Sequence, residues 1–237
     1  MTKGLFVLLL ACAGAANADI WHSGDLLTYT QADWGGDPGI DPGATLLVAS
    51  FDALYGAAGG VVVGSASRFV MVFTDADSVL AYIPSSGLFA PLNASVNDPI
   101  STVSGGFGGE VLGLELNVDF SDAGLLPGAS GIRFGDLILE NFSTLPALNG
   151  LTVRQFLADE NTCLGGGSCV VRIADLGTTL GDVNGSFFEG TQVTAFAQQH
   201  LVAPASPVPE PSYIGLLFAG TILLAVSRRK SKKSTSK

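Results

Sequence analysis

Two apolar runs without charge, one near each end of the chain, limit the part of this sequence that can fold as a globular domain. The first covers residues 4–18 and the second covers residues 213–226. Each is shorter than the roughly 20 residues that a helix needs to cross a bilayer unaided. The residues between them suffice for one domain of ordinary size. We therefore expect a single folded domain over 19–202.

The N-terminal run has the form of a secretory signal peptide. One lysine precedes it, and Ala16-Asn17-Ala18 fits the A-x-A pattern that signal peptidase accepts. We predict a signal peptide over 1–18, with Asp19 as the first residue of the exported protein. A lipoprotein signal ending at Cys12 is the alternative, and it fits the residues before that cysteine poorly.

The C-terminal run lies between a proline-rich segment and a basic cluster. Residues 203–211 form the predicted linker, and a helix over 213–226 would rise about 21 Å, short of the ~30 Å hydrocarbon core. The basic residues that follow are Arg228, Arg229 and Lys230. Positive charge beside a membrane segment predicts that this end stays cytoplasmic. Residues 212–237 are thus expected to hold one short transmembrane helix and a basic tail.

The order of elements in this tail resembles a known signal. Pro209-Glu210-Pro211, the apolar run and the basic cluster are similar to the PEP-CTERM sorting signal of Gram-negative bacteria. In that class an integral-membrane exosortase recognises the tail and removes it, and the class accompanies exopolysaccharide and biofilm production. The resemblance covers about the last 30 residues. It implies signal peptidase and exosortase as processing partners, a transient anchor in the inner membrane, and a final place at the cell surface or in the extracellular matrix.

The charge of the region between the two runs excludes one class of partner. Residues 19–208 contain no lysine, four arginines and twenty acidic residues, a net charge of −16. Such a surface is repelled by nucleic acid phosphates and by anionic lipid. We expect no nucleic-acid binding, and solubility outside the cell is the plain interpretation of the charge.

Cys163 and Cys169 are the two cysteines of this region. Export places them in an oxidising compartment, where cysteines so close in sequence are expected to form a disulfide. Three consecutive glycines between them allow the backbone to turn back. Zinc would need further soft ligands, and the two histidines of the chain are far from the pair in sequence.

The pattern of apolar residues predicts a mixed α+β domain, with strands in its N-terminal half packed against a helical C-terminal half. We expect adjacent strands in GGVVVG and RFVMVFT, and a further strand in IRFGDLILENF. A short helix is expected after Asp75 or Asp77 and before Pro84, and a longer one between Thr152 and Gly165. The Gly/Pro/Asp-rich residues 32–44 are expected to be loop.

Residues 110–120 satisfy two patterns. Apolar residues at every second position are typical of a strand, whereas leucine and glutamate favour a helix. The segments GGEVLGLELNVDFSDAG, NGLTVRQFL and LGDVNGSF are similar to segments of bacterial surface proteins of unknown activity, and there the first looks helical. This resemblance favours a helix, and a strand stays open as the alternative. It brings no catalytic residues.

Two other features could carry chemistry. Asp33, Asp37 and Asp41 recur at four-residue steps and could hold Ca²⁺, although aspartate before proline or glycine is ordinary turn chemistry. The aromatic residues Trp21, Tyr29 and Trp34 could stack on sugar rings, although such residues more often close a core.

No nucleophile motif is present, and no catalytic residue or cofactor is predicted. We therefore predict an exported, non-catalytic surface or exopolysaccharide-matrix protein. A secreted polysaccharide hydrolase is the alternative, because acid pairs such as Glu110 with Glu115, or Asp119 with Asp122, could serve glycoside cleavage.

Overall fold

A computed structural model describes residues 21–176 and 178–205 of this protein. The described residues as far as Ala203 form one compact unit. It is a mixed α and β structure with about 43% helix and 9% strand, so packing between helices dominates it.

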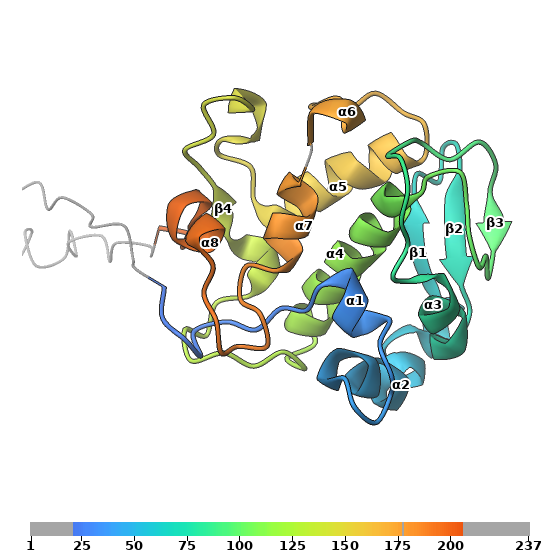
Figure 1. Cartoon of the computed structure of the whole chain (residues 1–237), viewed down its shortest axis with the longest axis horizontal. Coiled ribbons are helices and arrows are strands. Elements are labelled where there is room, and N and C mark those ends of the chain that lie inside the picture. Colours follow the sequence, from blue (N-terminus) through green and yellow to red (C-terminus); the bar gives the residue numbers. More distant parts are fainter. Residues whose placement is uncertain (1–20, 177, 206–237) are drawn as a thin grey trace, which may run out of the picture. The chain divides into compact units, whose positions relative to one another are not determined.

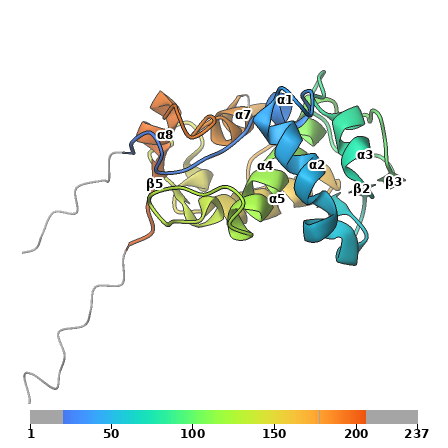
Figure 2. The same ribbon diagram turned by 90° about the horizontal axis from the view of Figure 1, so that it is seen from below.

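Helix α4 (Gly106–Asp122) is the element around which the others pack. It contacts α1 (Gln31–Trp34), α5 (Val153–Leu164), α7 (Thr179–Asn184) and the first strand of the sheet. Figure 2 shows α1 and α7 on one side of α4 and α5 on the other. The helix is buried on nearly all sides, as expected for a helix whose apolar residues do not keep to one face.

This helix decides between the two interpretations of residues 110–120. The apolar residues that alternate in sequence are all buried, and so are Gly113 and Asn117 between them, while Glu115 and Asp119 are half-buried. The alternation therefore arises because this helix is enclosed by its neighbours and has apolar residues on most of its sides. The helical prediction is confirmed, and the strand alternative is wrong.

A three-stranded sheet lies beside α4 (Figure 1). β1 (Val61–Gly64) pairs with β2 (Val70–Phe73) in antiparallel register, Val61 opposite Phe73, and β3 (Val96–Asn97) joins β2 in parallel. The predicted adjacent strands are thus confirmed as a hairpin. Their alternate residues Val61, Val63, Met71 and Phe73 are buried, which is the period of a half-buried strand.

The helix-start residues named from the sequence are in place. Asp75 caps α3 (Ala76–Tyr82) by accepting a hydrogen bond from the Ser78 backbone at 2.7 Å. Thr152 forms a capping box with Gln155 at the start of α5, and Gly165 follows its last residue. Both predicted helices are confirmed.

The remaining elements are short, apart from α2. They are α2 (Pro42–Tyr55), α6 (Ile173–Leu176), α8 (Ala195–His200), the paired strands β4 (Ile138–Leu139) and β5 (Leu201–Val202), and the 3-10 turns η1 (Gly56–Ala58), η2 (Phe134–Asp136) and η3 (Pro146–Leu148).

Some expectations are correct only at the coarser level. The domain is α+β, but its N-terminal half is not chiefly strand, because α1, α2 and α3 lie there with the sheet. The predicted strand in IRFGDLILENF shrinks to two residues, 138–139. The predicted loop over 32–44 contains most of α1 and the start of α2, since Pro42 occupies the first turn of that helix, where proline needs no backbone donor.

None of the helices within residues 21–176 and 178–205 has the length and apolar character needed to cross a membrane. The predicted transmembrane helix and basic tail over 212–237 lie outside the described residues.

The buried amide of Asn117 is expected to be a large contributor to stability. It accepts from the Tyr29 backbone N–H at 2.9 Å and donates to the Tyr29 carbonyl at 2.7 Å. Asn117→Ala would leave both buried backbone groups without partners, so the free energy of unfolding should fall by about 2–4 kcal/mol. Urea denaturation measures this. The exposed Asn93→Ala is the control and should change stability by no more than about 0.5 kcal/mol; equal effects of the two variants would contradict the argument.

Candidate functional site

The three candidate calcium ligands lie in and between α1 and α2. Asp33 accepts from the Thr30 backbone at 2.9 Å in a capping box, and an oxygen of Asp41 accepts from the Asp37 backbone at 2.7 Å. Within the described residues, no three acidic, histidine or cysteine side chains gather as a metal site would require. The structure thus places two of these aspartates in turn and capping hydrogen bonds.

Cys163 and Cys169 are brought together as expected. Their sulfur atoms lie at bonding distance and their Cα atoms are 5.1 Å apart. The Asp159 carboxylate accepts from the Val170 backbone at 3.0 Å, which holds the returning segment against α5. The disulfide therefore closes the loop that follows this helix.

The aromatic residues near the N-terminus are core residues. Trp21, Tyr29 and Trp34 are all buried, and the Trp34 ring lies 4.9 Å from that of Phe120 in α4. Their predicted place in the core is confirmed, and they offer no exposed platform to a sugar.

The acid pairs proposed for hydrolysis lie along α4. Glu110 accepts from the side-chain amides of Gln31 and Asn184, both at 2.8 Å. Glu115 lies five residues further along the helix, on a different flank, and accepts from the Asn161 amide at 2.8 Å. Since residues five apart on a helix are about 140° apart, Glu110 and Glu115 do not face each other.

Asp119 lies near Glu115, and not in a free pair with Asp122 as the sequence suggested. Asp119 and Glu115 are four residues apart, on the same face of α4, and the Tyr55 hydroxyl donates to Asp119 at 2.9 Å. Burial and the Asp119 charge raise the pKa of Glu115 to about 7, while the amide of Asn161 opposes the rise. Burial also raises the pKa of Asp119.

Asp122, the last residue of α4, is bound by an arginine. Arg154 makes two hydrogen bonds to its carboxylate, at 2.6 and 2.9 Å, and a third to Asp136 at 3.3 Å. This bidentate contact ties α5 to the end of α4 and to η2. Because Arg154 binds the Asp122 carboxylate, Asp122 is not free to pair with Asp119 in the way that glycoside cleavage would need.

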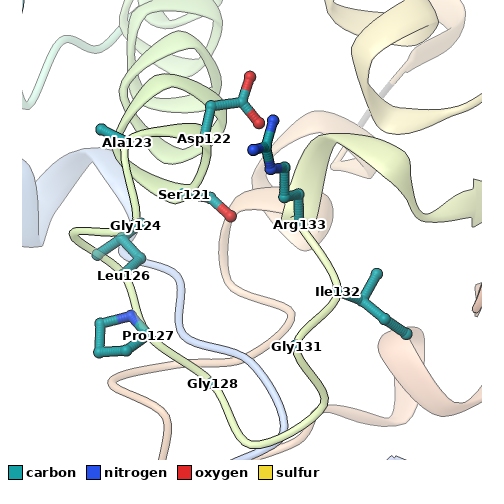
Figure 3. Close-up of a pocket in the computed structure, with 10 residues that line it drawn as sticks. All are labelled: Ser121, Asp122, Ala123, Gly124, Leu126, Pro127, Gly128, Gly131, Ile132 and Arg133. Carbon is teal, nitrogen blue, oxygen red and sulfur yellow. The ribbon is translucent and has the colours of Figure 1, made fainter.

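A pocket of about 350 Å³ lies next to this ion pair. Figure 3 shows its wall formed by the backbone that leaves α4 through Gly124 and returns through Gly131, with Asp122 and Arg133 pointing toward one another at its edge. The Ser121 hydroxyl accepts from the Phe134 backbone at 2.9 Å and joins the two sides. We call this the α4-end pocket. Its one carboxylate is Asp122.

A second pocket, of about 280 Å³, lies between α7, α8 and the segment after β4. We call it the α8 pocket. Its lining is mostly polar, and comprises Asn141, Phe142, Ser143, Thr144, Leu145, Thr179, Asp182, Phe196, Gln199 and His200. Asp182 is its one carboxylate, so neither of these two pockets presents the two facing acids that a glycosidase uses.

Glu160 is a buried acid that the sequence reasoning did not identify. Its side chain is fully buried, and neither carboxylate oxygen has a hydrogen-bond partner among the described residues. Burial, with a smaller contribution from Asp159, raises the pKa of Glu160 to about 8. A signal was available in the sequence, because Glu160 lies on the apolar stripe of α5 that includes Val153, Phe156 and Leu157.

The signal-cleavage residues Ala16, Ala18 and Asp19 lie outside the described residues, and so do Pro209, Glu210, Pro211, Arg228, Arg229 and Lys230.

Comparisons with protein-family models, with curated proteins and with solved structures found no match to this chain.

The disulfide yields a direct prediction. Replacing Cys163 and Cys169 together by alanine should lower the free energy of unfolding by about 2 kcal/mol, because the unfolded chain regains the entropy of a small open loop. Denaturant unfolding of the oxidised protein and of the variant measures this. Wild-type protein under reductant is the control and should behave as the variant does. Alkylation of both thiols in unreduced native protein would contradict the pairing.

Glu160 predicts how stability depends on pH. Its pKa is about 8 in the folded protein and about 4.5 when unfolded, so the folded state holds one more proton between these values. The free energy of unfolding should therefore fall as pH rises from about 4.5 to 8, by an amount on the order of 5 kcal/mol from this residue.

Glu160→Gln tests this dependence, because it removes the contribution of Glu160 to the slope of unfolding free energy against pH. We expect the variant to be more stable than wild type at pH 8 and to differ little at pH 4. Glu140→Gln, at an exposed position, is the matched control and should leave the slope unchanged. An unchanged slope in Glu160→Gln would show that this carboxyl is ionised in the folded protein.

Proposed function

We propose that this chain is an exported, non-catalytic surface or exopolysaccharide-matrix protein, sorted through its C-terminal tail. The observation that carries the proposal is the order of Pro209-Glu210-Pro211, the apolar run over 213–226 and the basic cluster at Arg228. In this proposal signal peptidase removes residues 1–18, and an exosortase reads the tail and cuts near the PEP motif. The membrane anchor is then transient.

The folded domain supports a role outside the cytoplasm. Its cysteines are arranged for a disulfide, a bond that persists in oxidising compartments. Its surface charge is strongly negative, with no lysine between residues 19 and 208. The acids considered for catalysis mostly serve as structural hydrogen-bond acceptors, as Glu110 and Asp122 do.

Intact-mass analysis of protein from fractionated cells tests the proposal. We expect the mature chain to begin at Asp19, to lack Lys237, to be two hydrogens lighter than its reduced form, and to bind the exopolysaccharide of its own cell in a pull-down. Replacing Pro209-Glu210-Pro211 by alanines should leave the tail attached and the protein in the inner membrane. Recovery of the uncleaved chain from the cytoplasm would refute the proposal.

A secreted polysaccharide hydrolase is a second candidate, and one observation favours it. Glu115 has a pKa near neutrality and lies one helical turn from Asp119, which is the kind of pair that can divide acid and base roles. Any hydrolytic activity on a glycan panel should then be lost in Glu115→Gln, which keeps the shape and the Asn161 contact. Inactivity of the wild-type protein on the panel would remove this candidate.

A further inference from the structure

The α8 pocket brings together polar groups from three separated parts of the chain. Asn141 follows β4, Asp182 lies in α7, and Gln199 and His200 end α8. The Asn141 side chain donates to the Gln199 carbonyl at 2.9 Å, which fixes one side of the pocket to the other. Asn141 has a positive φ of 63°, in the left-handed region that asparagine adopts more readily than most residues.

The hydrogen bond of His200 determines what its ring can offer. Nδ1 lies 2.9 Å from the Glu140 carbonyl oxygen, and because a carbonyl only accepts, Nδ1 must carry the proton. In the neutral ring Nε2 is then a hydrogen-bond acceptor. One oxygen of Asp182 accepts from the Thr178 hydroxyl at 2.9 Å, while its other oxygen has no partner among the described residues. Two acceptors are thus available to a ligand that carries hydroxyl groups.

The other lining groups complete a mixed surface. Ser143, Thr144 and Thr179 add hydroxyls, and the amide of Gln199 adds both a donor and an acceptor. Phe196, which is half-buried, is the aromatic ring at the wall of the pocket, and its centroid lies 5.0 Å from that of His200; Phe142 is buried and stacks on His200 with ring centroids 4.3 Å apart. Paired donors and acceptors beside an apolar ring match a sugar, which has hydroxyls around its edge and C–H groups on its faces.

The charge of the pocket and of the domain limits which sugars can bind there. The pocket contains a carboxylate and no arginine or lysine. Residues 19–208 carry a net charge of −16, which repels uronic acids and phosphorylated or sulfated sugars. A neutral sugar meets no such repulsion and can donate its hydroxyls to Asp182 and to Nε2 of His200.

We propose that the α8 pocket binds a neutral sugar unit of a polysaccharide, with Asp182 and His200 as the residues that accept its hydroxyls. This rests on the proposed function, because it names the ligand class and the site of a matrix protein. A pocket of about 280 Å³ has room for one such unit, so a single sugar should bind weakly and a polymer should gain affinity from repeated contacts.

NMR of the mature exported protein tests the site directly. The chain has two histidines, His22 and His200, so each imidazole signal can be assigned by substitution. We expect titration with methyl glycosides of glucose, galactose, mannose and N-acetylglucosamine to shift the His200 signals with at least one sugar. The His22 signals should stay in place, which provides an internal control. Methyl glucuronide should bind at least about tenfold more weakly, from the charge argument.

Asp182→Asn is the decisive variant, because it keeps the shape of the side chain and exchanges one acceptor for a donor. We expect its affinity for the sugar to fall about tenfold, the effect of one lost hydrogen bond to a charged group. Arg133→Gln, in the α4-end pocket, is the matched control and should bind as wild type does. Unchanged affinity in Asp182→Asn, equal loss in both variants, or no shift at His200 with any sugar would overturn the assignment.

The same variants separate this inference from the proposed function. If Asp182→Asn is exported, processed and retained by exopolysaccharide as wild type is, the sugar site fails and the sorted matrix protein stands. If the wild-type chain is found unprocessed in the cytoplasm, the proposed function fails, whatever the sugar titration shows.

Discussion

A chain of buried and half-buried amide contacts along α4 joins the parts of this domain. The Asn117 amide binds the Tyr29 backbone in both directions and donates to Asn184 in α7 at 3.2 Å. Asn184 donates in turn to Glu110, which also accepts from Gln31 in α1. A Cβ at Gly109 would collide with the end of the Gln31 side chain, so glycine there leaves room for the Gln31 amide that binds Glu110. Apolar burial draws these helices together, and the amide contacts select one arrangement, because any other would leave buried polar groups without partners.

Contacts between residues far apart in the chain set the limit of what the sequence predicts. Local signals were sufficient where they act within a few residues: the caps Asp75 and Thr152 and the Val61–Phe73 hairpin are all in place. The alternation over 110–120 was ambiguous because a helix enclosed on nearly all sides has no broad polar face to set a period of 3.6. The short β4 and β5 pair depends on residues more than sixty positions apart, a contact that no local pattern reveals. The candidate sugar site has the same origin, since Asn141 and Gln199 meet only in the fold.

Burying acidic side chains lowers the stability of this core, and the structure compensates for that in two ways. Those of α4 each receive a partner: amides at Glu110 and Glu115, a hydroxyl at Asp119 and a guanidinium at Asp122. Glu160 receives none within the described residues, and burial raises its pKa to about 8, so it is held as the neutral acid at pH 7. A domain with four arginines and no lysine cannot pair every acid with a cation. Amides, hydroxyls and protonation therefore serve the acids that no arginine reaches, and stability depends on pH.

The distribution of charge connects the domain to its tail. Six of the eleven basic residues follow Val226, so a cut near Pro209-Glu210-Pro211 would release a protein far more acidic than the full chain. In the proposed topology these cations lie on the cytoplasmic face of the membrane and the acidic domain on the opposite face, so they would not offset the repulsion between the domain and anionic lipid. In the proposed function, removal of the tail would take away the membrane segment, and this repulsion would then favour release from the membrane surface. The same negative charge would also repel anionic glycans, which is why the proposed sugar site favours neutral sugars.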